Sequence, residues 1–219
     1  MIDVARQDYP DRDTLMRSLA ELVADQLRAA HATKHRASLA VPGGTTPGPF
    51  LTALSDADLV WSEIDVIPTD ERQVSELSHR SNARLIRETL LRGPAADARF
   101  IPLQDGLRRV EPILPLDVLV LGMGGDMHTA SLFPGAPELR DALATGAPAL
   151  MEITPPDQPE RRITLTGPAI ASASVIHVLI TGSDKLAALA TALEDGPASV
   201  APIRVALTAP CPVTVHYAD

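Results

Sequence analysis

The sequence predicts an α/β fold, in which a mainly parallel sheet carries helices on both faces. Short apolar segments rich in β-branched residues alternate along the chain with segments whose apolar residues recur at helical spacing, and such alternation is typical of parallel sheets. Three apolar segments are followed at once by glycine-rich or charged turns. Because ligands of these sheets bind beyond the carboxyl ends of the strands, we expect the turns to converge at one edge and form a site.

Four helices are predicted. In the first, leucines and valine recur at helical spacing from Asp13 to about Ala30, which makes the helix amphipathic. The other three are predicted over 50–54, 81–91 and 185–193, each after a predicted strand. A polar loop is expected ahead of the helix at 81–91.

Strands are predicted over 37–41, 64–67, 116–121 and 175–180, because short apolar runs bounded by turns are typical of buried strands. Prolines and alanines become frequent between 134 and 168, with one further strand predicted over 161–166. We expect this region to be an excursion or small lobe. With 219 residues, the whole chain (1–219) is predicted to form one domain.

The composition argues against several classes of partner. The formal net charge is −9 and only 3% of residues are aromatic, so neither a nucleic-acid groove nor an anionic-membrane surface is expected. One cysteine and no histidine pair at ligand spacing predict no disulfide, metal or cofactor. No apolar stretch reaches the roughly 18 residues of a membrane span. We therefore expect a cytoplasmic monomer, for which an anionic small molecule remains a suitable ligand.

The first of the three turns reads VPGGTTPG and follows the strand at 37–41. Gly43 and Gly44 leave backbone N–H groups accessible, Thr45 and Thr46 add hydroxyls, and Pro47 suits the first turn of the next helix. These features predict an anion-binding turn, although an ordinary strand-to-helix turn with a threonine cap is the alternative. The turn lacks the Lys-Ser/Thr ending of a nucleotide-binding P-loop.

The second turn presents Asp70, Glu71 and Arg72 in a row after the strand at 64–67. Charges in such a position are often merely solvated, but the guanidinium of Arg72 is suited to gripping a phosphate through two hydrogen bonds. Lys185 begins the helix after the strand at 175–180 and is one of only two lysines in the chain. A phosphate contact is predicted for it, with a solvated surface lysine as the alternative.

The third turn reads GMGGDMH at 122–128 and follows the strand at 116–121. Its glycines nearly match a dinucleotide fingerprint, but Met127 takes the place of the third glycine, so we reject a nucleotide site. His128 is either a hydrogen-bonded structural histidine or a base. Its place after a glycine turn at a strand end favours the base, since a neutral imidazole accepts protons at physiological pH.

Taken together, these motifs resemble the 6-phosphogluconolactonase family. The resemblance spans most of the chain from about 40 to 190 and follows the family's order, through the blocks PGGTTP (42–47), TDERQV (69–74), SNARLIRETLL (81–91), GMGGDMHTASLFPG (122–135), RRITLT (161–166) and TGSDKLAAL (181–189). It implies a modified Rossmann-like fold. The activity that it implies is metal-free hydrolysis of the δ-lactone of 6-phosphogluconate.

The resemblance also implies a role for individual residues. His128 corresponds to the general base that activates water for attack on the lactone carbonyl, while Asp70 and Arg162 line the pocket. The phosphate is expected to lie among Gly43, Gly44, Thr45, Thr46, Arg72 and Lys185.

This chain departs from the family pattern at two positions. Met127 replaces the glycine that usually precedes the histidine, and it implies backbone strain if φ is positive there. Ser75 replaces a proline that often follows the acidic-arginine block.

Two other functions remain as alternatives. A deaminase or isomerase of amino-sugar phosphates has a similar histidine turn, but it typically continues with an Asn-Glu pair where this chain has Leu132-Phe133. A non-catalytic sugar-phosphate sensor would normally carry a DNA-binding or other output module, and no basic helix is available here.

Overall fold

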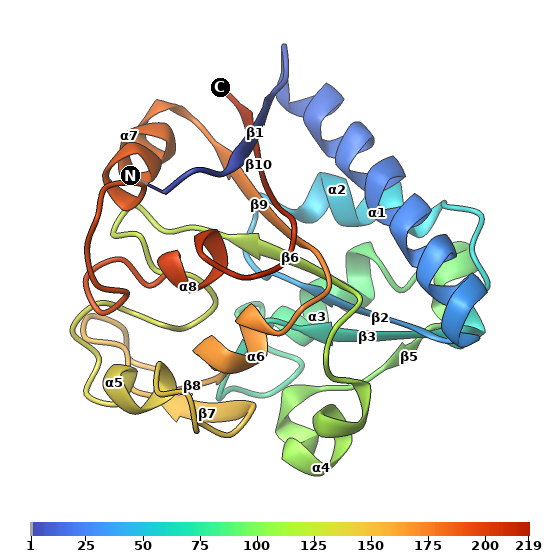
Figure 1. Cartoon of the computed structure of the whole chain (residues 1–219). Helices are drawn as coiled ribbons and strands as arrows, with labels where there is room; N and C mark the ends of the chain where they lie inside the picture. The colour runs from blue at the N-terminus through green and yellow to red at the C-terminus, as the bar shows by residue number, and fades with distance from the viewer. Residues whose placement is uncertain (1) are drawn as a thin grey trace.

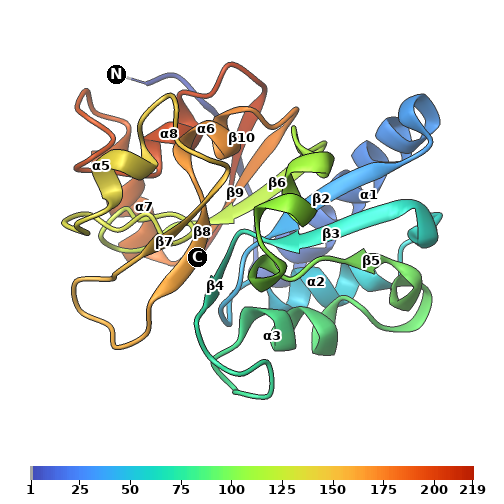
Figure 2. The same cartoon turned by 90° about the horizontal axis from the view of Figure 1, so that it is seen from below.

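The computed structural model describes residues 2–219 and contains a large parallel sheet beside a small antiparallel one (Figure 1). The strand order of the large sheet is β1 (Ala5–Asp8), β10 (Val213–Ala218), β9 (Ile176–Thr181), β6 (Val118–Gly122), β2 (Ala37–Val41), β3 (Ile64–Pro68) and β5 (Arg99–Phe100). The small sheet has the order β4 (Asp70–Arg72), β8 (Arg162–Leu165) and β7 (Leu150–Ile153). Figure 2 shows β4 leaving the end of β3 to run beside the other two strands.

Helices cover both faces of the large sheet. One face carries α1 (Arg12–Lys34), α2 (Gly48–Ser55) and α3 (Asn82–Thr89). The core on the other face receives α4 (Leu107–Val110), α5 (Leu139–Ala142), α6 (Gly167–Ala171), α7 (Ser183–Ala192) and α8 (Arg204–Leu207). The α/β architecture predicted from the sequence is confirmed.

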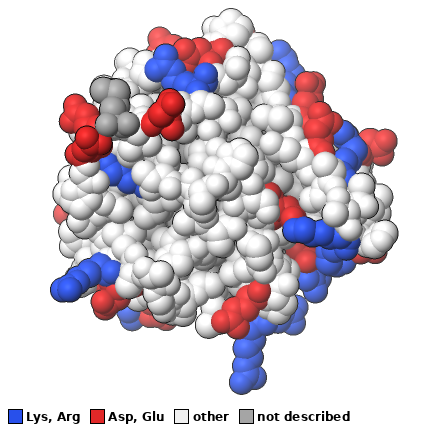
Figure 3. Space-filling view, in the orientation of Figure 1, with Lys and Arg blue, Asp and Glu red and all other residues white. Residues whose placement is uncertain are grey.

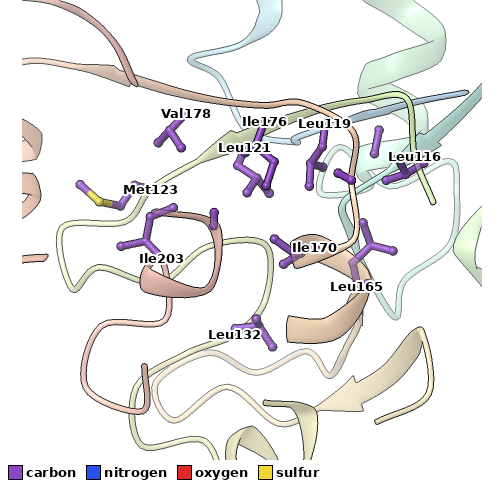
Figure 4. Close-up of a cluster of buried hydrophobic side chains, with 14 of the residues drawn as sticks. Leu116, Leu119, Leu121, Met123, Leu132, Leu165, Ile170, Ile176, Val178 and Ile203 are labelled. Carbon is purple, nitrogen blue, oxygen red and sulfur yellow. The ribbon is translucent and has the colours of Figure 1, made fainter. Parts of the chain in front are cut away.

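Strand β6 shows why the central strands of the large sheet have continuous apolar sequences. Successive side chains of a strand point to opposite faces, so Val118 and Val120 pack under α1 and α2 while Leu119 and Leu121 join the other core. Figure 4 shows Leu119 and Leu121 facing Ile170 and Ile203. Both faces of the sheet are therefore buried.

The predicted helices and strands are all present, with ends that shift by a few residues. The excursion at 134–168 contains α5, β7 and β8, and Ile153 and Leu165 bury it against the main core. The strands β1, β5, β7 and β10 and the short helices α4, α5, α6 and α8 were missed. The side chains of β1 are all exposed, so it carries no apolar signal. The polar loop expected before α3 was partly wrong, because 70–72 pair with β8 as a strand.

A row of hydrogen-bonded polar side chains crosses the layer beneath α1. The hydroxyl of Tyr9 lies 2.9 Å from Nδ1 of His216, whose Nε2 lies 2.9 Å from Nδ1 of His177, and Nε2 of His177 lies 2.8 Å from Oε1 of Gln26. The amide oxygen of Gln26 only accepts hydrogen bonds. Starting from the Tyr9 hydroxyl, each side chain in this row therefore donates to the next, and His177 donates to Gln26. Burial lowers the pKa of His177 to about 3 and that of His216 to about 4.

The surface in Figure 3 carries its Lys, Arg, Asp and Glu side chains mainly around the rim, and its middle, over α6 and α8, is largely uncharged. Within residues 2–219, none of the helices combines the length and apolar character needed to cross a bilayer.

The central strands β2 and β6 mark the point where the strand order reverses. From β2 the chain proceeds through β3 to β5, and from β6 it proceeds the other way through β9 to β10. The loops after β2 and β6 therefore leave the sheet edge in opposite directions and open a crevice between them, which is the usual ligand position in such sheets.

Candidate active site

The crevice at the ends of β2 and β6 is a cavity of about 280 Å³. Segments that follow β2, β3, β6 and β9 line it, together with the beginning of β8. The structure brings all the site residues predicted from the sequence to this one cavity: Gly43, Gly44, Thr45, Thr46, Asp70, Arg72, His128, Arg162 and Lys185.

The turn that carries His128 is closed by its own backbone. The N–H of Gly124 donates to the carbonyl of His128 over 2.9 Å, and the N–H of Met127 donates to the carbonyl of Gly124 over 3.0 Å. A Cβ at Gly124 would lie 2.1 Å from Nδ1 of His128, so only glycine fits there. The φ of Met127 is 65°, which confirms the positive φ anticipated at this position.

A carboxylate and an aromatic ring fix the imidazole of His128. Nδ1 lies 2.5 Å from Oδ1 of Asp126, and the ring packs 4.6 Å from the ring of Phe133. The hydrogen bond with His128 holds the pKa of the Asp126 carboxyl below its usual value. Because Nδ1 is engaged by the carboxylate, Nε2 is the ring nitrogen left for a ligand.

Asp70 joins two of the site's loops. Its Oδ2 accepts a hydrogen bond of 2.6 Å from the hydroxyl of Ser131, just beyond the His128 turn. Asn82, which the sequence analysis missed, donates from Nδ2 to the Asp70 carbonyl over 2.8 Å. A Cβ at Gly43 would lie only 2.0 Å from Oδ1 of Asn82, so this amide lies directly against the glycine turn.

Glu71 was noted in the second turn but its role was missed: it positions its neighbours without lining the cavity. It is fully buried, and it accepts hydrogen bonds from the backbone N–H of Asn82 over 2.8 Å and of Ala83 over 2.7 Å. N–H groups in the first turn of a helix have no acceptor within the helix itself, so the Glu71 carboxylate caps α3. Since side chains alternate along a strand, Asp70 and Arg72 are left pointing to the opposite side.

Two arginines of the small sheet face each other across β4 and β8. Arg72 is the direct cross-strand partner of Arg162, a position in which like charges destabilise a sheet. Arg162 is only 2% exposed, and burial together with the charge of Arg72 lowers the pKa of its guanidinium. Among residues 2–219, nothing accepts a hydrogen bond from the buried Nε of Arg72, Arg162 or the nearby Arg80. The guanidiniums of Arg72 and Arg162, which line the cavity, would attract an anionic ligand.

Lys185 supplies a further cation to the cavity. Its Nζ lies 3.6 Å from the position of a Cβ at Gly125, so it borders the turn that carries His128. Gly44, with φ of 90°, and the two threonines line the same cavity, directly ahead of α2. Backbone N–H groups at the start of a helix attract anions. The cavity thus combines one oriented imidazole with three cationic side chains.

The family model described as glucosamine-6-phosphate isomerases/6-phosphogluconolactonase matches residues 10–213 of this chain. A 6-phosphogluconolactonase of Pseudomonas aeruginosa is 43% identical over 214 residues, which cover 92% of this chain and 89% of that protein. A 6-phosphogluconolactonase of Mesorhizobium japonicum is 41% identical over 224 residues, 96% of this chain and 93% of the other.

A solved structure shows the same fold. The crystal structure of a 6-phosphogluconolactonase from Shewanella baltica superposes with a TM-score of 0.94 at 35% sequence identity. The superposition covers 100% of both chains.

Proposed function

Because this chain belongs to the glucosamine-6-phosphate isomerase/6-phosphogluconolactonase family, we propose that it hydrolyses 6-phospho-D-glucono-1,5-lactone to 6-phosphogluconate, the lactonase step of the oxidative pentose phosphate pathway, in the cytoplasm. One observation carries the proposal above all. His128, held at Nδ1 by Asp126, borders a cavity that also contains Arg72, Arg162 and Lys185. Hydrolysis of a phosphorylated ester requires this combination of a base and anion-binding groups.

The reaction begins with a water molecule bound beside Nε2 of His128. The imidazole takes a proton from the water as its oxygen attacks the lactone carbonyl carbon, and Asp126 stabilises the imidazolium that forms. The tetrahedral intermediate then collapses, and the bond between that carbon and the ring oxygen breaks. The ring oxygen receives the proton from His128 and becomes the hydroxyl of the open-chain acid, so the base is regenerated.

The substrate phosphate is assigned to the turn at Gly43–Thr46 with the cations of Arg72 and Lys185. The turn offers backbone N–H groups and hydroxyls at the start of α2. Arg72 has an unpartnered Nε, and Lys185 lines the same cavity. Asp70 and Arg162 line it as well.

A deaminase or isomerase is the main alternative within the family. Its Asn-Glu pair is replaced here by Leu132 and Phe133, and both of these side chains are buried. The Phe133 ring packs against the imidazole of His128. An apolar ring at this position offers no carboxylate for proton transfer on an amino sugar, so the lactonase is favoured over the deaminase.

The experiment is lactone hydrolysis by the purified chain without added metal, with the spontaneous reaction subtracted at every pH. We expect the His128→Asn variant to fold and bind 6-phosphogluconate but to lose roughly 10²- to 10⁴-fold in kcat, the usual range for a general base. Near wild-type kcat in that folded variant would make the histidine structural. Ammonia release from glucosamine 6-phosphate would support the deaminase instead, and binding of 6-phosphogluconate without lactone turnover would support a sensor.

A further inference from the structure

The guanidiniums of Arg72 and Arg162 have N–H groups for which the protein supplies no acceptor. Arg72 and Arg162 are cross-strand neighbours, so their Cβ atoms lie about 5 Å apart. The carboxylates of Asp70 and Glu160 act on the charge of Arg162, but among residues 2–219 the buried Nε of each arginine has no acceptor. Two like charges in this state are costly unless a ligand supplies the acceptors.

The two guanidiniums are held differently. Nη1 of Arg72 donates to the carbonyl of Arg80 over 2.6 Å, at the end of the loop before α3. Nη2 of Arg162 donates to Oε1 of Gln158, which also lines the cavity. Each arginine therefore has one N–H group fixed by the protein, and this orients the rest of the guanidinium.

Strand β8 is joined directly to the segment that follows His128. The N–H of Ser131 donates to Oγ1 of Thr164 over 3.0 Å. Thr164 and Arg162 lie two residues apart on β8, so their side chains point to the same face of the strand. Arg162 therefore lies on the strand that is hydrogen-bonded to Ser131, just after His128.

The chemistry of the substrate fits a pair of adjacent cations. In the δ-lactone, only the ring oxygen, two carbons and the ester oxygen separate the carbonyl carbon from the phosphorus. Neighbouring arginines are thus able to serve both groups of one molecule. On the proposed function, Arg72 has the phosphate as its ligand, which leaves the acceptor of Arg162 unassigned.

We infer that Arg162 binds the carbonyl oxygen of the lactone, an assignment that rests on the proposed lactonase activity. When water attacks, this oxygen gains the negative charge of the tetrahedral intermediate, and N–H groups of Arg162 donate to it. When the ring carbon–oxygen bond breaks, the same oxygen becomes one of the two oxygens of the product carboxylate. Arg162 therefore contributes to the transition state and also binds the carboxylate of the product.

The test compares two open-chain ligands, 6-phosphogluconate and sorbitol 6-phosphate, which differ in that the second has a hydroxymethyl group in place of the carboxylate. By calorimetry, wild type should bind 6-phosphogluconate at least about 10-fold more tightly, as hydrogen bonds to a charged group predict. The Arg162→Gln variant should bind sorbitol 6-phosphate as wild type does but lose most of that preference. Its kcat should fall by roughly 10²- to 10³-fold, as for loss of an oxyanion donor.

Arg161→Gln is the matched control. Arg161 is the adjacent residue, and its side chain forms an exposed ion pair of 3.0 Å with Glu152, so the preference and kcat should stay at wild-type values. Equal weakening of both ligands in Arg162→Gln would make Arg162 a phosphate ligand and overturn the inference. Should that variant fail to fold, equal affinity of wild type for the two ligands would overturn it as well. Failure of the proposed function would differ from both results, because wild type would then hydrolyse no lactone, whether or not it bound the two ligands.

Discussion

Asp126 and His128 form a hydrogen-bonded pair, with Oδ1 of the carboxylate 2.5 Å from Nδ1 of the imidazole. The turn holds them together, because a side chain at Gly124 would collide with both. In the proposed mechanism the carboxylate therefore has two effects: it leaves Nε2 for the attacking water, and it stabilises the positive charge that the ring acquires during the reaction.

Replacing Asp126 by Asn should lower kcat by more than about 10-fold, approaching the roughly 10⁴-fold cost of a wrong imidazole tautomer in serine hydrolases. KM should change little, since no phosphate contact is lost. Background-corrected kinetics from pH 5 to 8 provide the measurement. The exposed Asp141→Asn variant is the control, and an unchanged kcat in Asp126→Asn would remove the carboxylate from the mechanism.

Arg72→Ala should mainly raise KM, because a phosphate contact is made equally in the ground state and the transition state. We expect kcat to change far less than in the Asp126 variant. The matched change Arg108→Ala, on the exposed side of α4, should leave KM unaltered. Thermal unfolding supplies a second readout: 6-phosphogluconate should raise the Tm of wild type through binding to the folded state, and gluconate should do so much less. An unchanged KM for the phosphorylated lactone would exclude Arg72 from the phosphate site.

At Met127 the backbone has a φ of 65°, which β-branched residues adopt only at high cost. Met127→Ile and Met127→Leu keep an apolar side chain of similar volume and differ mainly in branching. The Ile variant should therefore be less stable than the Leu variant by about 1 kcal/mol or more. Urea unfolding of the two variants measures the difference. If they prove equally stable, the turn relaxes its φ and the methionine is unstrained.

Acidification should destabilise the fold through His177 and His216. Their pKa values, about 3 and about 4 in the folded chain, lie below the value of about 6.5 that a histidine has in the unfolded chain. Between these limits the unfolded state binds more protons, so the free energy of unfolding falls as the pH is lowered from 6.5 toward 4. The slope is up to about 1.4 kcal/mol per pH unit for each histidine.

Denaturant unfolding at several pH values tests this stability effect. His177→Gln combined with His216→Gln should reduce the slope, whatever its effect on stability at pH 7. His79→Gln alters an exposed histidine outside this row of hydrogen bonds, so it should not reduce the slope. An equally steep slope in the double variant would show that other groups cause the acid sensitivity.

The sequence was sufficient to predict the central strands and the residues that line the cavity. Strand β6 is an apolar run that ends in glycines, and both features follow from burial on two faces and a tight turn. Strand β1 could not be predicted in this way, because its exposed side chains carry no pattern and its position comes from backbone pairing with β10.

The supporting residues of the site were harder to predict than the lining residues. Asn82 and Glu71 act through contacts between a strand end and a helix start that are separated along the chain. The order Ser81-Asn82 at the beginning of α3 was a usable signal for the helix cap. No pattern within the sequence, however, indicated that Glu71 would supply the remaining acceptors.

The strand order has a consequence for how the molecule is made. The turn at Gly43–Thr46 leaves the ribosome early, but β6, which completes the crevice with it, comes much later, and Lys185 follows only after β9. Among the described strands β1 pairs with β10 alone, so β1 stays unpaired until β10 has been synthesised. On the proposed function, a nascent chain therefore lacks the complete site for the sugar phosphate, and we expect ligand binding to stabilise only molecules whose synthesis has passed α7.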